Sequence, residues 1–132
     1  MLRTCWKALP LGRDTCIGSS AVCFQPSDTS RSLPPRYLRS HPVLSRIAAL
    51  NVLSAARQKL DSLDKVTRVV RLCIYLATYG DFFDQPKVAD AASELFRDVF
   101  GDDKTSVRMV LGVASLPLGM PVAVEVILEI EV

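Results

Sequence analysis

The chain has 132 residues and a mass of 14.5 kDa, which is enough for one domain and too little for two independent cores. Hydrophobic residues make up 49% and charged residues 23%, so the composition is that of a folded globular domain rather than of a disordered chain. The net charge of +2 is uneven: residues 1–43 hold six Lys/Arg and two Asp (net +4), and residues 44–132 hold ten Lys/Arg and twelve Asp/Glu (net −2). Because the larger part is negative, we expect neither nucleic acid nor a membrane surface as a partner.

The first 43 residues show no persistent helical or strand period. They hold five of the eight prolines and many Ser, Thr and Arg residues. Such a composition predicts an irregular extension. A second interpretation stays open: the segment is rich in Arg and Ser and poor in acids, as organellar transit peptides are.

Cysteine and histidine usage argues against a metal site. Three of the four cysteines lie in the first 23 residues at spacings that match no zinc motif, and His41 is the single histidine. The sequence also has no phosphate-binding loop, so we expect no metal and no cofactor. Cys73 lies in an apolar run and is expected to be a small buried side chain.

No apolar run near the N-terminus is long enough for a secretory signal, and we expect a cytoplasmic protein, or an organellar one if residues 1–43 are a transit peptide. The apolar stretch 109–124 contains Pro117, Gly119 and Pro121. These residues favour a strand, a turn and a second strand over a membrane helix.

From residue 40 onward, the pattern predicts a helix, a strand, a helix and two strands. Ser40 is a candidate cap for the first helix, which runs to about residue 60. An extended run at 66–77, apolar on both faces, predicts an interior strand, and 79–81 a turn. Apolar residues at helical spacing predict a second helix from the cap Asp84 to Gly101, which ends it. Strands at 106–114 and 122–132 complete an α+β domain with two helices on one face of a sheet.

The faces of the last two strands are predicted from their alternation. The first strand carries Val107, Met109, Leu111 and Val113 on one face, which we expect the helices to cover. The opposite face then carries Arg108 together with Ala123, Glu125 and Glu129 of the second strand. That face is half apolar, which suits a subunit interface.

The segment 108–125 resembles the C-terminal signature of the YjgF/Rid family (endoribonuclease L-PSP, chorismate-mutase-like). The signature is an arginine nine residues before a Leu-Pro pair, followed by an acidic alternating strand, here Arg108, Pro117 and Glu125. Upstream, 63–76, 81–83 and 95–101 resemble the helix-to-strand passage and second helix of the family. The resemblance covers about residues 44–132. It implies a chorismate-mutase-like mixed sheet with two helices on one face, and a homotrimer with sites between subunits.

The resemblance also implies an activity and a site. Members hydrolyse 2-imino or 2-enamino acids to 2-oxo acids and ammonia, and Arg108 matches the arginine that binds the substrate carboxylate. A guanidinium suits this role because it grips a carboxylate through two parallel hydrogen bonds. From position alone, the alternative is a strand arginine paired with Glu125 or Glu129. Glu125 matches the second of two family glutamates and is the one candidate catalytic residue.

Three positions depart from the family pattern. Ala123 stands where the water-positioning glutamate is usual, and an alanine neither orients water nor accepts its proton. Ala89 stands where many members have an asparagine. Residues 1–43 do not resemble the glycine-rich strands with which the family begins, which suggests an altered start in their place, such as a shifted reading frame.

Three functions follow from these observations. The first is an imine or enamine deaminase with weak or absent turnover, and the second a non-catalytic trimeric protein that binds a small carboxylate metabolite. The third is an endoribonuclease, from the older name of the family. Residues 44–132 hold no histidine and no basic stripe with aromatic residues, so the sequence favours the third function least.

Overall fold

The computed structural model of the protein describes residues 4–10, 15–23, 41–78 and 82–131. Two helices and five strands follow one another along these segments, with short 3₁₀ turns at Leu63–Lys65, Asp102–Lys104 and Pro117–Gly119. The elements are β1 (Thr4–Pro10), β2 (Thr15–Cys23), α1 (His41–Leu60), β3 (Val66–Ala77), α2 (Gln85–Phe100), β4 (Thr105–Val113) and β5 (Val122–Glu131).

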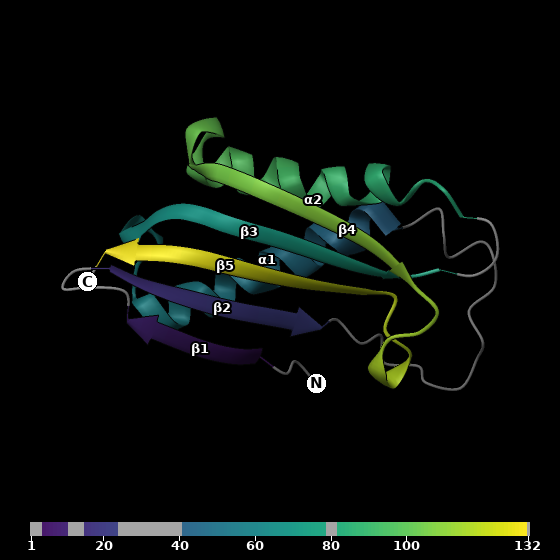
Figure 1. Ribbon diagram of the computed structural model, residues 1–132, viewed down its shortest axis with the longest axis horizontal. Helices are drawn as coiled ribbons and strands as arrows, with labels where there is room; N and C mark the ends of the chain where they lie inside the picture. Colours follow the sequence, from purple (N-terminus) through teal and green to yellow (C-terminus); the bar gives the residue numbers. More distant parts are fainter. Residues whose placement is uncertain (1–3, 11–14, 24–40, 79–81, 132) are drawn as a thin grey trace.

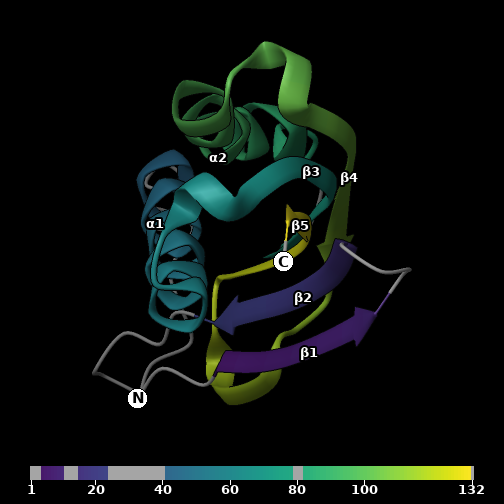
Figure 2. The ribbon, with the colours of Figure 1, turned by 90° about the vertical axis from the view of Figure 1, so that its left-hand side faces the viewer.

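The five strands form one mixed sheet in the order β1-β2-β5-β3-β4 (Figure 1). Strands β3 and β4 are parallel, because α2 carries the chain back between them, and the other neighbours are antiparallel. Both helices lie on the same side of the sheet (Figure 2). There α1 packs on β5 and β2, and α2 packs on β3 and β4. The α+β architecture and the two helices on one face are therefore confirmed.

The expected irregular extension is wrong for residues 4–10 and 15–23, which form two strands. The backbone of β2 pairs with β5, with Val22 opposite Val124, and β1 pairs with β2, with Thr4 opposite Val22. The physical reason is that a ladder uses backbone N–H and C=O groups, which any sequence offers once a partner strand provides an edge. The sheet thus has N-terminal strands despite their atypical sequence. Residues 24–40 lie outside the described segments, and neither the transit peptide nor the altered start is tested.

The core is built on the alternation of β5. Its helix-facing residues are between 0% and 8% exposed, and the residues between them are half-buried on the other face. The helix-facing set is Val122, Val124, Val126, Leu128 and Ile130. Helix α2 covers its part of the sheet with an apolar stripe, which also agrees with the expected pattern; the buried residues are Val88, Ala89, Ala92, Leu95 and Phe96.

The helices and strands from residue 41 onward begin and end within one or two residues of their predicted bounds. The predicted helix caps are confirmed in part. Gly101 ends α2 with a left-handed φ of 88°, a conformation that glycine adopts without a Cβ clash. Asp84 precedes α2 but makes no capping hydrogen bond, and its carboxylate instead pairs with Lys87 at 2.8 Å. The expected cap Ser40 and the turn at 79–81 lie outside the described residues.

The predicted orientation of β4 is wrong. Val107 is 65% exposed and Leu111 42% exposed on the open face of the sheet. Arg108 instead lies in register with Leu72, a buried residue of the helix-covered face. On this face the guanidinium of Arg108 has polar partners, because Asp90 and Ser93 of α2 accept its hydrogen bonds. Because side chains alternate along a strand, the register that directs Arg108 to α2 directs the neighbouring apolar residues of β4 to the open face.

One buried hydroxyl ties the two helices together and gives a stability prediction. Ser45 of α1 is fully buried, and its Oγ lies 2.6 Å from the carbonyl oxygen of Val88 in α2, to which it donates. Ser45→Ala should lower the free energy of unfolding by about 1 kcal/mol more than Ser54→Ala, the typical contribution of one hydrogen bond. Ser54 is an exposed residue of the same helix, so the change in helix propensity is matched. Urea unfolding of both variants measures the difference, and equal effects would show that the bond contributes nothing.

Candidate functional site

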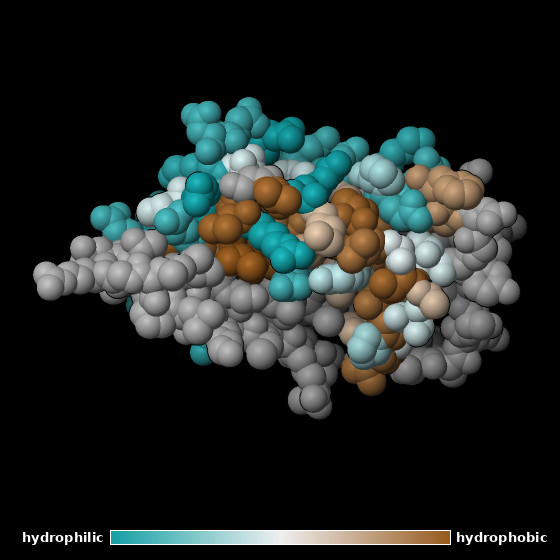
Figure 3. Space-filling view, viewed as in Figure 1, coloured by the Kyte–Doolittle hydropathy of each residue, from teal (hydrophilic) through white to brown (hydrophobic). Residues whose placement is uncertain are grey.

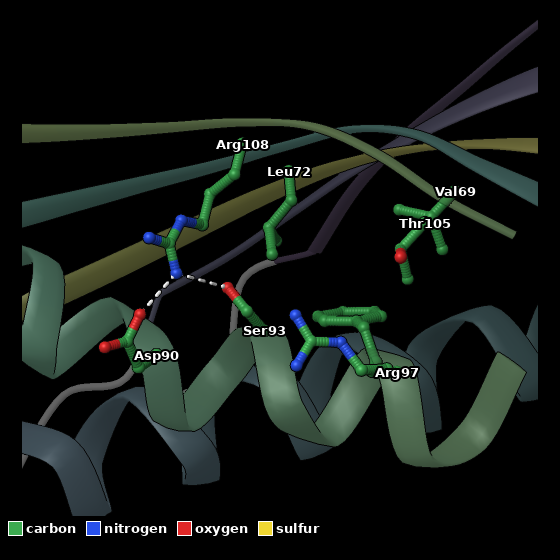
Figure 4. A pocket seen from close by; sticks show the side chains of 8 residues that line it. Val69, Leu72, Asp90, Ser93, Arg97, Thr105 and Arg108 are labelled. Carbon is green, nitrogen blue, oxygen red and sulfur yellow. Dashed lines mark hydrogen bonds and ion pairs between the residues drawn. The ribbon is translucent and has the colours of Figure 1, made fainter. Parts of the chain in front are cut away.

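Arg108 extends from β4 into a groove between the sheet and α2 (Figure 4). Its Nη1 donates to Oδ1 of Asp90 at 2.6 Å and to Oγ of Ser93 at 3.2 Å. The side chains of Arg108 and Asp90 are 36% and 49% exposed, so the pair is reachable from solvent. The alternative, in which Arg108 pairs with a glutamate of β5, is wrong. Glu129 instead forms an ion pair with Arg68, with 3.2 Å between Oε2 and Nε.

The groove has a volume of about 250 Å³, which suits a small ligand. Its apolar part comes from both β3 and α2, and its polar part from α2 and β4. The lining residues are Val69, Leu72, Asp90, Ser93, Phe96, Arg97, Thr105 and Arg108. A groove with apolar walls and a few charged groups is the usual form of a small-molecule site.

Helix geometry explains how α2 supplies three of these groups. Asp90, Ser93 and Arg97 follow one another at intervals of three and four residues, so they lie on one flank of the helix. That flank borders the buried stripe and faces β4. The hydroxyl of Ser93 donates to the carbonyl of Ala89 at 3.1 Å, which leaves its oxygen free to accept from Arg108.

The guanidinium of Arg108 retains binding capacity. Both of its hydrogen bonds use Nη1, and within the part of the chain that the structure describes Nε and Nη2 donate to no protein group. Those two nitrogens form the second edge of the guanidinium fork, which fits a carboxylate with two parallel hydrogen bonds. A carboxylate at this second edge leaves the exposed ion pair between Nη1 and Asp90 in place.

Glu125 lies on the opposite face of the sheet from Arg108. Its Oε2 accepts a hydrogen bond from the Tyr75 hydroxyl at 3.1 Å. Partial burial raises the pKa of Tyr75, and the hydrogen bond to Glu125 raises it further. Ala123 is in register with Tyr75 on this same open face. Within one chain, the structure therefore does not bring the two predicted site residues together.

Beside Glu125 on the open face, Arg71 covers a pair of sulfur atoms. Its Nε donates to Sγ of Cys73 at 3.0 Å, and its Nη2 lies 3.8 Å from Sδ of Met109. Cys73 is a free, buried thiol, as the sequence predicts.

No group of three His, Cys, Asp or Glu residues within the described segments is arranged to hold a metal ion. Neither described helix has the length and apolar character of a membrane span.

Sequence reasoning missed most of the groove: Asp90, Ser93, Arg97 and Thr105, as well as Tyr75 on the other face. The helical spacing of Asp90, Ser93 and Arg97 was a usable signal, because polar residues that border an apolar stripe lie at the edge of the helix–sheet contact. Their pairing with Arg108 depends on which face of β4 meets α2, and no sequence pattern settles that choice.

Comparisons with known proteins support the fold. No family model matches the sequence. The chain is 38% identical over 87 residues to protein TCP17 of Trypanosoma cruzi, a match that covers 65% of this chain and 54% of that protein. The chain thus spans about half the length of this curated relative.

Among solved structures, protein Atu1372 of Agrobacterium tumefaciens, of unknown function, aligns with a TM-score of 0.75 and 25% identity over 92% of this chain and 79% of its own. A proposed endoribonuclease of Shewanella oneidensis aligns at 0.73 and 20% identity over 93% and 83%. The YjgF gene product of E. coli aligns at 0.52 and 16% identity over 92% and 84%. The chain therefore has the YjgF/Rid-like fold. These alignments cover more than residues 44–132 supply, so they extend into the N-terminal strands.

The bond between Tyr75 and Glu125 gives a pH prediction. The pKa of Tyr75 is raised above its ordinary value of 10.0. The stability linked to the protonated phenol is therefore complete below about pH 10 and is lost as the pH rises through the folded-state pKa. Glu125→Gln should lower the titration midpoint of Tyr75, followed by NMR of the ring, since it removes a neighbouring negative charge. Glu131→Gln, at the exposed end of β5, is the control. A midpoint that does not move in Glu125→Gln would contradict the bond.

Proposed function

We propose that this chain is a small-molecule-binding protein of the YjgF/Rid type that binds a small carboxylate at Arg108. The observation that carries the proposal is the guanidinium of Arg108 in a small groove, with one edge held by Asp90 and Ser93 and the other edge available. A held guanidinium is pre-oriented, so less conformational entropy is lost when the ligand binds.

Weak or absent hydrolysis of 2-imino or 2-enamino acids is part of this proposal. Water must be activated close to the carbon that it attacks, and an alanine at 123 supplies no base. Glu125 is directed to the other face of the sheet from Arg108, so it does not reach a substrate bound in the groove of its own chain. Catalysis as a deaminase is the alternative, and it requires a second subunit to bring an acid to Arg108.

We further propose that the open face of the sheet is covered by other copies of the chain, as in a homotrimer. Apolar side chains gather on this face (Figure 3), among them Val107, Met109 and Leu111. Strand β4 pairs only with β3 in the described sheet, so its outer edge is open. An exposed apolar surface beside an open strand edge favours association over a monomer in water.

Endoribonuclease activity has less support. The single histidine, His41, is the first residue of α1 and is not among the residues that line the groove, so the groove has no imidazole for acid–base catalysis. The groove combines cations with Asp90, and a carboxylate opposes binding of the phosphate backbone.

We propose a cytoplasmic location, which fits the free buried thiol of Cys73, since reducing compartments preserve thiols.

Carboxylate binding is tested by substitution of Arg108. Arg108→Ala should weaken the binding of propanoate or pyruvate about tenfold or more, the effect of a charge-assisted hydrogen bond of about 1.5 kcal/mol. Arg108→Lys should restore only part of the affinity, because an ammonium lacks the two-pronged geometry. NMR titration measures both, with Arg57→Ala on α1 as an exposed control. Unchanged affinity in Arg108→Ala would remove its role.

Turnover is measured as ammonia release from an iminopropanoate generated in situ. We expect a rate close to that of spontaneous hydrolysis, because residue 123 has no carboxylate. An acceleration that disappears in Glu125→Gln would overturn the non-catalytic proposal and establish the deaminase.

The interface is tested by placing a charge on the open face. Leu111→Lys should shift the protein toward monomer in light scattering at tens of micromolar, because a buried unpaired ammonium destabilises an interface. Val99→Lys on α2 is the matched control, since Val99 is 44% exposed and Leu111 42%. A wild-type protein that is already monomeric, or equal effects of the two substitutions, would argue against the proposed interface.

A further inference from the structure

We propose that the ligand of the groove carries a second anionic group, which binds to Arg97. The ligand class is then a short dicarboxylate, with one carboxylate at Arg108 and the other at Arg97. This inference rests on the proposed function, since Arg108 must hold the first carboxylate. It adds a specificity-determining residue to the site.

Arg97 lies in the same groove as Arg108, but on the other wall. It follows Ser93 by one helical turn on α2, and its guanidinium is directed along the groove in Figure 4. Its Nε lies 2.8 Å from Oδ1 of Asp102, with which it forms an ion pair. Within the described segments its two terminal nitrogens have no hydrogen-bond partner, so this guanidinium also has an edge available for a ligand.

The charges of the groove favour an anion. The lining includes two guanidiniums and one carboxylate, that of Asp90, and so has a net charge of +1. A single carboxylate at Arg108 would leave Arg97 balanced only by Asp102, which is 80% exposed. Such surface ion pairs contribute little, so exchange of Asp102 for a ligand carboxylate costs little free energy.

The rest of the lining fits the chain between two carboxylates. Val69, Leu72 and Phe96 provide apolar contacts for methylene groups. The hydroxyl oxygens of Ser93 and Thr105 are polar groups of the same lining, and Thr105 donates its proton to the carbonyl of Asp102 at 2.9 Å. With that proton used, Thr105 is not positioned to donate to a ligand, which leaves the arginines as the main anion-binding groups.

The test compares butanoate with butanedioate, which have the same chain length and differ in one carboxylate. Both acids are fully ionised at pH 7.5, and NMR titration at constant ionic strength measures their affinities. We expect wild-type protein to bind butanedioate about fivefold more tightly, a gain at the low end for a charge-assisted hydrogen bond because Arg97 is half-exposed. Arg97→Gln should abolish this preference, so that the variant binds the two acids with equal affinity. Arg57→Gln, an exposed arginine outside the groove, is the control for net charge.

The outcomes separate the two proposals. If neither acid binds, or if Arg108→Gln leaves both affinities unchanged, the proposed carboxylate site is wrong. If Arg108→Gln weakens butanoate binding but the wild type shows no preference for butanedioate, Arg97 has no such role. A preference that Arg57→Gln removes as strongly as Arg97→Gln would assign it to overall charge, which also overturns the inference. Amide chemical shifts of Arg97→Gln that match those of the wild type away from the groove show that the variant is folded.

Discussion

The alternation of β5 is the constraint on which the rest of the structure depends. Five aliphatic side chains on one face of this strand are almost completely buried, and a shift of one residue would direct Glu125 and Glu129 into the core. Because β5 lies between β2 and β3, its register fixes which face of the whole sheet the helices cover. The positions of α1 and α2, and therefore of the groove, follow from that choice.

The same constraint places the two candidate site residues, Arg108 and Glu125, on opposite faces of the sheet. The helix-covered face carries Arg108 beside Asp90 and Ser93, where a groove lies between α2 and β4. The open face carries Glu125 with Tyr75, next to exposed apolar residues. A single chain therefore has a binding group on one face and its remaining acidic candidate on the other. This separation is the structural reason for our proposal of binding without turnover.

Much of the fold could be predicted from the sequence, and the site only in part. The two helices and the strands β3, β4 and β5 have strong local periods, so their existence and bounds were predicted correctly. The strands at 4–10 and 15–23 have no such period, and their pairing depends on the edge of β5, a contact distant in the sequence. The orientation of β4 was misjudged because both of its faces are partly apolar, and the face that meets α2 depends on the register with β3, a tertiary contact. Arg108 was identified from a motif, whereas its partner Asp90 depends on tertiary packing.

Strand β4, which carries Arg108, is an edge strand of the described sheet. Its backbone forms ladder hydrogen bonds with β3 alone in that sheet. In a parallel pair, alternate amides of such a strand point away from the neighbour, toward water or another chain. The arginine is therefore carried by a backbone that opens more readily than the central strands and exchanges its outward amide hydrogens faster. A ligand that bridges β4 and α2 would reduce the motion of this edge strand, and so would a neighbouring chain paired along it. Either would also reduce the motion of the Arg108 guanidinium. Occupancy of the groove and assembly would then be thermodynamically linked through one strand.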